Sequence, residues 1–183
     1  MLTVSILLAA VFLEVAIRCL VYGGVLSVPA PPPAHSTLWD PAHSEFGVWH
    51  HPHATAVHTR QEFSVVYRTN SIGARDVERK RYSDHSRVVV LGDSFIEGWG
   101  VSEAQRLTNL LETSTGLEHL NFGMSHFGPY QSLLVYRNLA KKYSHDGLIV
   151  GVLPLNDFWD LDYKAAQTAL RYEYRFRPYL LGD

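Results

Sequence analysis

The 183-residue sequence contains one cysteine, Cys19, and no surplus of basic residues. A lone cysteine cannot form an internal disulfide, and zinc ribbons and CxxC redox sites are excluded because they need several cysteines. Sixteen Lys and Arg stand against eighteen Asp and Glu, so no basic excess is present to neutralise nucleic-acid phosphates. Hydrophobic residues make up 46% of the chain, which suffices for a buried core and argues against disorder. The length fits one domain with a modest remainder.

Charge is almost missing from residues 1–28, where Glu14 and Arg18 interrupt an otherwise apolar stretch. As a helix, this stretch is long enough to cross a hydrocarbon core of about 30 Å, so we predict a transmembrane anchor. Glu14 and Arg18 are four residues apart and are expected to pair on one helix face.

Two alternatives remain for this segment: a cleaved signal peptide and a buried helix of a soluble protein. A signal peptide normally begins with basic residues, which this segment lacks. Its best cleavage site, at residues 28–30, is followed by Pro31, which should block cleavage. A lipoprotein signal is excluded because Arg18 directly precedes Cys19, at the position where such a signal needs a small residue. Neither flank carries the excess of Lys and Arg that sets membrane orientation.

Proline and histidine dominate residues 29–60, which we predict to be a linker. Its prolines make a stiff spacer: Pro29, Pro31, Pro32 and Pro33. His50, His51 and His53 form a His-His-x-His cluster, and neutral imidazoles are good zinc ligands. We nevertheless predict no metal site, because nothing fixes their geometry in a proline-interrupted segment.

Residues 61–86 predict a small β-element, and residues 87–183 predict an α/β domain built from strand–loop–helix repeats. The expected elements are strands at 87–91, 117–120 and 147–153 and helices at about 102–116 and 130–143. Short apolar runs without alternation are typical of strands in a parallel sheet. Right-handed crossovers then give the strand order 2-1-3.

Each predicted strand of this sheet is followed by a polar motif at its carboxyl end, where ligands bind in open parallel sheets. Ser94 follows the first strand and is placed to act as a nucleophile. Gly123 follows the second, where an N–H without a side chain in the way can approach an oxyanion. Asn156 follows the third and offers an amide donor. Each motif alone is equally typical of a structural turn or helix cap.

Together these motifs resemble the SGNH (GDSL-type) hydrolase family. Residues 90–95 (Val-Leu-Gly-Asp-Ser-Phe) resemble its first block, residues 121–123 (Asn-Phe-Gly) its second, and residues 156–157 (Asn-Asp) its third. Residues 70–76 and 177–179 are similar to segments of membrane-anchored bacterial members.

The resemblance implies a three-layer, flavodoxin-like parallel sheet with its main domain outside the cytoplasm. It also implies that Ser94 is the nucleophile and that the oxyanion hole consists of the N–H groups of Ser94 and Gly123 and the side chain of Asn156. The motif-supporting residues are Gly92, Asp93, Asn121 and Asp157. The implied substrates are acyl esters, including acetylated polysaccharides, and no metal or organic cofactor is implied.

The chain departs from the family in two places. Pro154 stands where the third block usually has Gly, and no histidine follows Asn156, so the Asp-x-x-His block that supplies the base is missing. The only such string, at residues 40–43, would need a permuted topology to reach the site. We expect an incomplete domain of about three βα units, with residues 147–153 as an exposed edge strand. Ser94 is then almost inert, with His126 as a makeshift base at most.

Other functions are also open. A nucleotide-binding loop at Gly92, Gly98 and Gly100 has the wrong glycine spacing. A non-catalytic anchored protein of the same fold, binding a glycan or a protein partner, is a stronger alternative. The alternating aromatic residues Tyr172, Tyr174 and Phe176 fit a sugar-stacking strand or a half-buried edge strand. Hydrolase and acyltransferase use the same acyl-enzyme, so the sequence does not separate them, and it does not indicate an oligomeric state.

Overall fold

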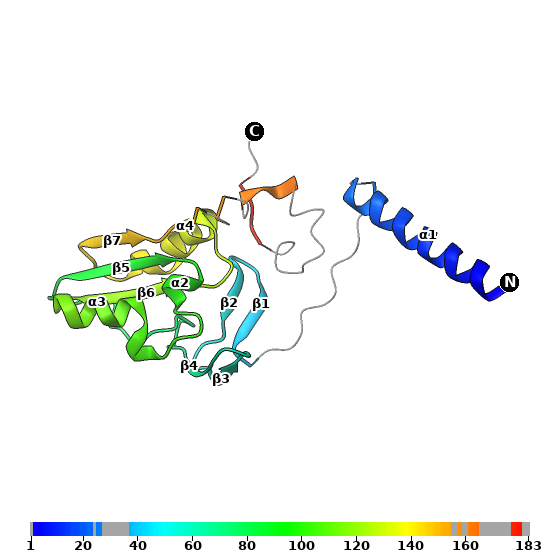
Figure 1. The fold of residues 1–183 in the computed structure, drawn as a ribbon. Coiled ribbons are helices and arrows are strands. Elements are labelled where there is room, and N and C mark those ends of the chain that lie inside the picture. Colours follow the sequence, from blue (N-terminus) through cyan, green and yellow to red (C-terminus); the bar gives the residue numbers. More distant parts are fainter. Residues whose placement is uncertain are drawn as a thin grey trace.

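The computed structural model describes residues 2–23, 25–26, 37–154, 157–158, 161–164 and 177–180. The elements, in chain order, are α1 (Leu2–Tyr22), β1 (Trp39–His43), β2 (Gly47–His50), β3 (Thr55–Thr59), β4 (Ser64–Arg68), β5 (Arg87–Gly92), α2 (Ser94–Glu97), the 3-10 helix η1 (Glu103–Gln105), α3 (Leu107–Thr115), β6 (Glu118–Gly123), α4 (Pro129–Asn138), the 3-10 helix η2 (Ala140–Lys142) and β7 (Gly147–Val150). Figure 1 shows the three-stranded sheet with its helices and the long helix α1. The proline spacer, Asn156 and residues 172–176 lie outside the described residues.

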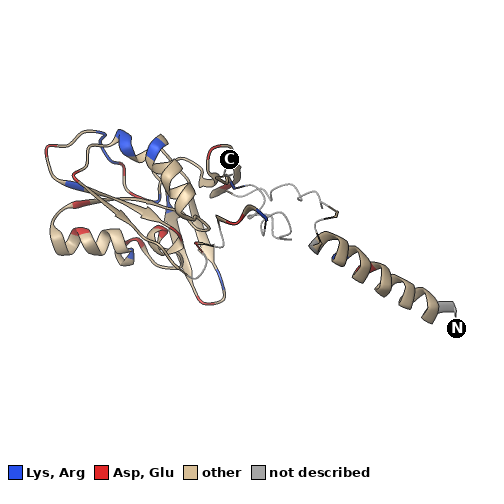
Figure 2. Cartoon of the chain, turned by 90° about the horizontal axis from the view of Figure 1, so that it is seen from above, with Lys and Arg blue, Asp and Glu red and all other residues tan. Residues whose placement is uncertain are grey.

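Helix α1 is apolar on all sides and is drawn almost entirely without charge in Figure 2. The window Val4–Val21 has a mean hydropathy of 2.4, and only 6% of it is buried. The Arg18 guanidinium and the Glu14 carboxylate pair at 2.7 Å, as their spacing predicts. Within the described residues this is one helix long and apolar enough to cross a membrane, a property that signal sequences share.

The main sheet is parallel, with β5 in the centre and the strand order β6-β5-β7. This confirms the predicted order 2-1-3, which right-handed crossovers impose on three consecutive strand–helix units. Gly92 is in register with Gly123 across β5 and β6, so the first two polar motifs leave the sheet side by side.

The helices are shorter than the sequence predicts. A 3-10 turn precedes α3, which begins at Leu107 and ends at Thr115, where the C-cap Gly116 with a φ of 71° stops the helix. The second helix is α4, which ends at Asn138 and is followed by a 3-10 turn.

Two antiparallel hairpins, β1-β2 and β3-β4, precede the sheet. Three of these four strands fall inside residues 29–60, where the sequence predicts a linker. They form because aromatic side chains of this segment pack against the main domain: Phe46 and Trp49 are buried in its core. Residues 37–60 are therefore part of the folded unit.

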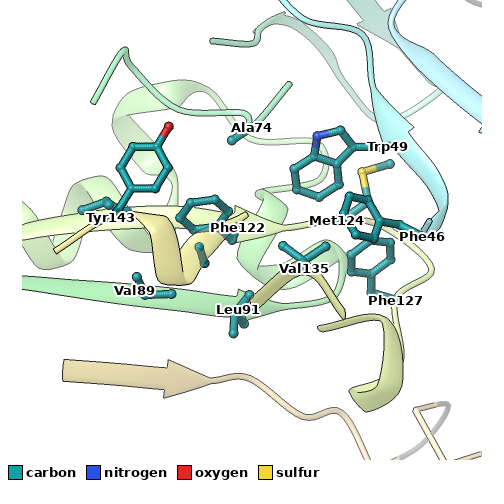
Figure 3. Packing of buried hydrophobic residues seen from close by; sticks show 12 residues of the cluster. Phe46, Trp49, Ala74, Val89, Leu91, Phe122, Met124, Phe127, Val135 and Tyr143 are labelled. Atoms are coloured by element: carbon teal, nitrogen blue, oxygen red, sulfur yellow. The ribbon is translucent and has the colours of Figure 1, made fainter. Parts of the chain in front are cut away.

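The core lies on the face of the sheet that α4 covers (Figure 3). Val89 and Leu91 of β5 and Phe122 of β6 contribute from the sheet, and Val135 contributes from α4. Trp49 closes one end by stacking on Phe127, with ring centroids 5.9 Å apart. This packing fixes the hairpin β1-β2 beside the carboxyl end of the sheet.

Strand β7 pairs with β5 on one side only. Leu148, Ile149 and Val150 are 48%, 39% and 47% exposed, although their sequence is typical of a buried strand. In the described residues β7 is therefore an exposed apolar edge, as expected for a sheet of three strands.

Candidate active site

Ser94 is the first residue of α2, directly beyond the carboxyl end of the central strand β5. Asp93 caps this short helix, and its Oδ1 accepts a hydrogen bond from the Phe95 N–H at 2.9 Å. Gly92 has a φ of 152°, and a Cβ there would lie 2.6 Å from Ile96 and 3.0 Å from the Gly151 carbonyl. The Gly-Asp-Ser sequence thus builds a strand-to-helix turn that leaves the Ser94 side chain half-buried.

The backbone N–H of Ser94 has no hydrogen-bond acceptor among the described residues. An unpaired N–H at the start of a helix is the type of donor that stabilises an oxyanion. Ser94 therefore offers both a hydroxyl and a backbone donor at the same point.

Gly123 lies next to this turn, but its N–H is already engaged. It donates to Asn121 Oδ1 at 2.9 Å, and a Cβ on Gly123 would lie 2.6 Å from the backbone carbon of Ile96. Close packing of β6 against α2 thus explains the glycine at this position. The oxyanion role of Gly123 stays a prediction that requires its bond to Asn121 to open.

The third motif is described only in part. Asn156 lies outside the described residues, so its distance from Ser94 is not defined. Asp157 is buried, and its Oδ2 accepts the Leu153 N–H at 2.8 Å while its own N–H donates to the Leu153 carbonyl at 3.1 Å. Asp157 therefore supports the turn after β7 rather than facing solvent.

The loop after β6 brings His126 toward the same end of the sheet. Its Met124 N–H donates to the Gly92 carbonyl at 3.0 Å, which ties the loop to the turn that carries Ser94. His126 has a φ of 67°, a left-handed conformation that a non-glycine residue rarely adopts. Arg177 Nη2 donates to its carbonyl at 2.5 Å, so the first residue of the family-like tail at 177–179 contacts this loop.

Two cavities flank Trp99 at this end of the domain. The first, of about 510 Å³, has Ser94 in its wall together with Phe95 and Leu110. The second, of about 210 Å³, is lined by Trp39 and His126 among others. Trp99 lines both, whereas Ser94 lines only the first and His126 only the second. No described imidazole or carboxylate is hydrogen-bonded to the Ser94 side chain.

Among the described histidines of the early segment, His43, His50, His51 and His53 are not hydrogen-bonded to Ser94. His43, from the Asp-x-x-His string, stacks on Phe46 with centroids 4.7 Å apart and does not line the Ser94 cavity. His50 is buried, whereas His51 and His53 are exposed, so the His-His-x-His cluster does not gather around one point. Within the described ranges no three His, Cys, Asp or Glu side chains are grouped as metal ligands.

Sequence reasoning missed a buried polar network centred on Glu97, which lies on the same short helix, α2, as Ser94. Glu97, three residues further along α2, receives His50 Nε2 at 2.8 Å on one oxygen. Its other oxygen accepts the backbone N–H of Ser125 at 2.9 Å and the Ser125 hydroxyl. His50 Nδ1 lies 3.1 Å from the Gly73 carbonyl, so both ring nitrogens face acceptors and the doubly protonated ring fits both contacts.

Burial by itself raises the pKa of Glu97, but the hydrogen bond and charge of His50, with the hydrogen bond of Ser125, hold that pKa below its ordinary value. Glu97 is thus an ionised buried carboxylate that joins β2, α2 and the loop carrying His126. No local sequence signal pairs it with His50, because the two residues are 47 positions apart.

The segment at residues 70–76 has a clear structural role. Arg75 places its guanidinium 3.4 Å from the centroid of the Tyr67 ring and donates to the carbonyls of Glu97 and Val101 at 3.1 and 2.8 Å. It therefore holds the loop that follows Ser94. Asp76 accepts the Asn121 N–H at 3.1 Å, and burial raises the pKa of its carboxyl in spite of the opposing effect of Arg79.

The sequence matches no protein-family model and no curated protein.

Proposed function

We propose that this chain carries the nucleophile of an SGNH-type serine acyl-ester hydrolase built on a flavodoxin-like sheet. One observation carries the proposal: Ser94 stands at the carboxyl end of the central strand, its side chain in the wall of a cavity of about 510 Å³, with an unpaired N–H among the described residues. A hydroxyl and a backbone donor at one point are what acyl transfer through serine requires.

In the proposed reaction Ser94 Oγ attacks the acyl carbon of an ester. The bond between Oγ and that carbon forms, the bond to the alcohol oxygen breaks, and the serine proton passes through a base to the departing alcohol. Water then attacks the acyl-enzyme, releases the acid and returns a proton to Ser94. An acyltransferase follows the same path with a second alcohol in place of water.

The reaction is slow in this chain as it stands. A serine hydroxyl is a weak nucleophile without an adjacent base, and no described imidazole or carboxylate is hydrogen-bonded to the Ser94 side chain. Loss of a triad base reduces rates by about 10⁴ to 10⁶. His126 lines the neighbouring cavity and acts at most as a distant base.

We propose that α1 anchors the chain in a membrane as a single span, because it is long and apolar enough to cross one. That the main domain lies outside the cytoplasm is proposed from the resemblance to membrane-anchored members of the family. The proposed substrates are O-acyl esters, including acetylated glycans, and the proposed chemistry needs neither metal nor organic cofactor.

A second candidate is a non-catalytic anchored protein of the same fold that binds a glycan or a protein partner. No base is hydrogen-bonded to Ser94 within the described residues. This favours the second candidate, because a protein that only binds its ligand needs no catalytic base.

A fluorophosphonate probe on the full chain in lipid nanodiscs tests the proposal. We expect slow labelling of Ser94 that is lost in Ser94→Ala and kept in Ser102→Ala, an exposed serine. If Ser94 is labelled no faster than Ser102, the hydrolase proposal fails and the binding protein is favoured. Stoichiometric labelling of Ser94 within minutes would mean that a base acts on it, against the slow reaction proposed here.

A further inference from the structure

The cavity beside Ser94 is walled mainly by hydrocarbon. Its apolar side chains come from α2, α3 and the loop between them: Phe95, Trp99, Val101, Leu107 and Leu110. We refer to these five residues, together with Ser94 in the same wall, as the Ser94 groove. Its chemistry narrows the class of ester that Ser94 can accept.

The apolar side chains of this groove are turned outward rather than into the core. Phe95 is 69% exposed and Leu110 is 53% exposed, whereas their neighbours Ile96 and Thr108 are almost wholly buried. Leu107 and Leu110 are three residues apart and share one face of α3. Exposed apolar clusters of this kind mark binding surfaces in soluble domains.

The groove offers little to a sugar. Among the described residues that line it, the polar groups besides Ser94 are the Trp99 indole N–H and the side chain of Gln105, whose Oε1 already accepts the Ser102 hydroxyl at 2.9 Å. A sugar ring buried here would leave hydroxyl groups without partners, which is costly, whereas a hydrocarbon chain needs none.

We propose that the Ser94 groove binds the acyl chain of the ester, and that it prefers an acyl group with a hydrocarbon chain longer than acetyl. This inference rests on the proposed function of Ser94, because Ser94 lies in the wall of the groove and is the residue proposed to accept the acyl group. A cavity of about 150 Å³ is large enough for benzene, so a groove of about 510 Å³ has room for a longer chain.

The test is competition with a photoreactive decanoyl ester that cross-links to the full chain in nanodiscs. Methyl octanoate is expected to compete at a concentration roughly 60-fold lower than methyl acetate, since six added methylenes gain about twofold each when half-buried. Cross-links are expected on α2 and α3 residues of the groove. Equal competition by the two esters, or cross-links on other elements, would overturn the inference.

Two variants separate the groove from general partitioning into lipid. Leu110→Gln is expected to weaken octanoate competition about fivefold. Leu133→Gln changes a leucine of α4 that is 40% exposed, against 53% for Leu110, and is expected to leave the competition unchanged. If both variants behave alike, the groove is not the binding site. Octanoate competition without any acylation of Ser94 instead contradicts the hydrolase proposal while the groove assignment holds.

Discussion

Truncating Glu97 to alanine is expected to destabilise the domain more than the loss of any exposed charge. The Glu97 carboxylate is fully buried and receives hydrogen bonds from His50, at 2.8 Å, and from both the N–H and the hydroxyl of Ser125. Removing one partner of a buried ion pair typically costs about 3–5 kcal/mol, because the other partner is left buried without compensation. We expect Glu97→Ala to lower the free energy of unfolding by that amount.

Urea unfolding of the full chain in detergent micelles, followed by tryptophan fluorescence, measures this change. Trp49 stands next to His50 in the core and reports on the same region. The matched control is Glu103→Ala, which removes an exposed pair with Arg68 at 3.4 Å and is expected to cost less than about 1 kcal/mol. A loss below about 1 kcal/mol for Glu97→Ala as well would refute the buried-network argument.

Three further predictions concern the backbone at Gly98, the pH dependence due to His58 and the membrane helix α1. Gly98 has a φ of 85°, and Gly98→Ala places a Cβ against Arg106, so we expect it to lower the free energy of unfolding in urea by about 3 kcal/mol. Gly116→Ala, whose Cβ would lie in open space, is expected to lower it by about 1 kcal/mol. Equal losses of unfolding free energy would contradict the packing argument. Burial and the charge of Arg60 lower the pKa of His58 below its ordinary value of 6.5. The contribution of neutral His58 to the free energy of unfolding is therefore complete above pH 6.5 and is lost as the pH falls through the folded-state pKa. His58→Phe should therefore flatten the unfolding free energy between pH 7 and 5, and an unchanged slope would remove His58 as its cause. Carbonate extraction should leave the full chain in the membrane fraction and release a Leu8→Asp, Val11→Asp double variant, and retention of that variant would argue against a spanning helix.

The parallel sheet was predictable from sequence because its strands carry a local signal. Val89, Val90 and Leu91 form an unbroken apolar run, and all three are buried in the central strand. The strands β1, β2 and β3 carry no such signal, because Pro41 interrupts β1, Pro52 separates β2 from β3, and each strand is four or five residues long. They are stabilised by aromatic contacts with residues far along the chain, as in the stacking of Trp49 on Phe127.

The candidate site likewise contains one residue that the sequence alone locates and a network that it does not. The position of Ser94 follows from the strand that precedes it, so sequence alone locates it. The network of His50, Glu97 and Ser125 depends on three elements meeting, and no spacing rule links them. Gly123 shows a further limit, since its hydrogen bond to Asn121 is a detail of side-chain placement that a motif does not specify.

The central claim, that Ser94 is the acyl-accepting nucleophile, is tested most directly by identifying the acylated residue after treatment of the full chain with an aryl octanoate and added imidazole. Free imidazole supplies the base that the described residues do not place on Ser94. The account predicts an octanoyl group on Ser94 that forms faster as imidazole is raised and is missing in Ser94→Ala. Acylation spread over exposed serines such as Ser102, with no preference for Ser94 at any imidazole concentration, would contradict it.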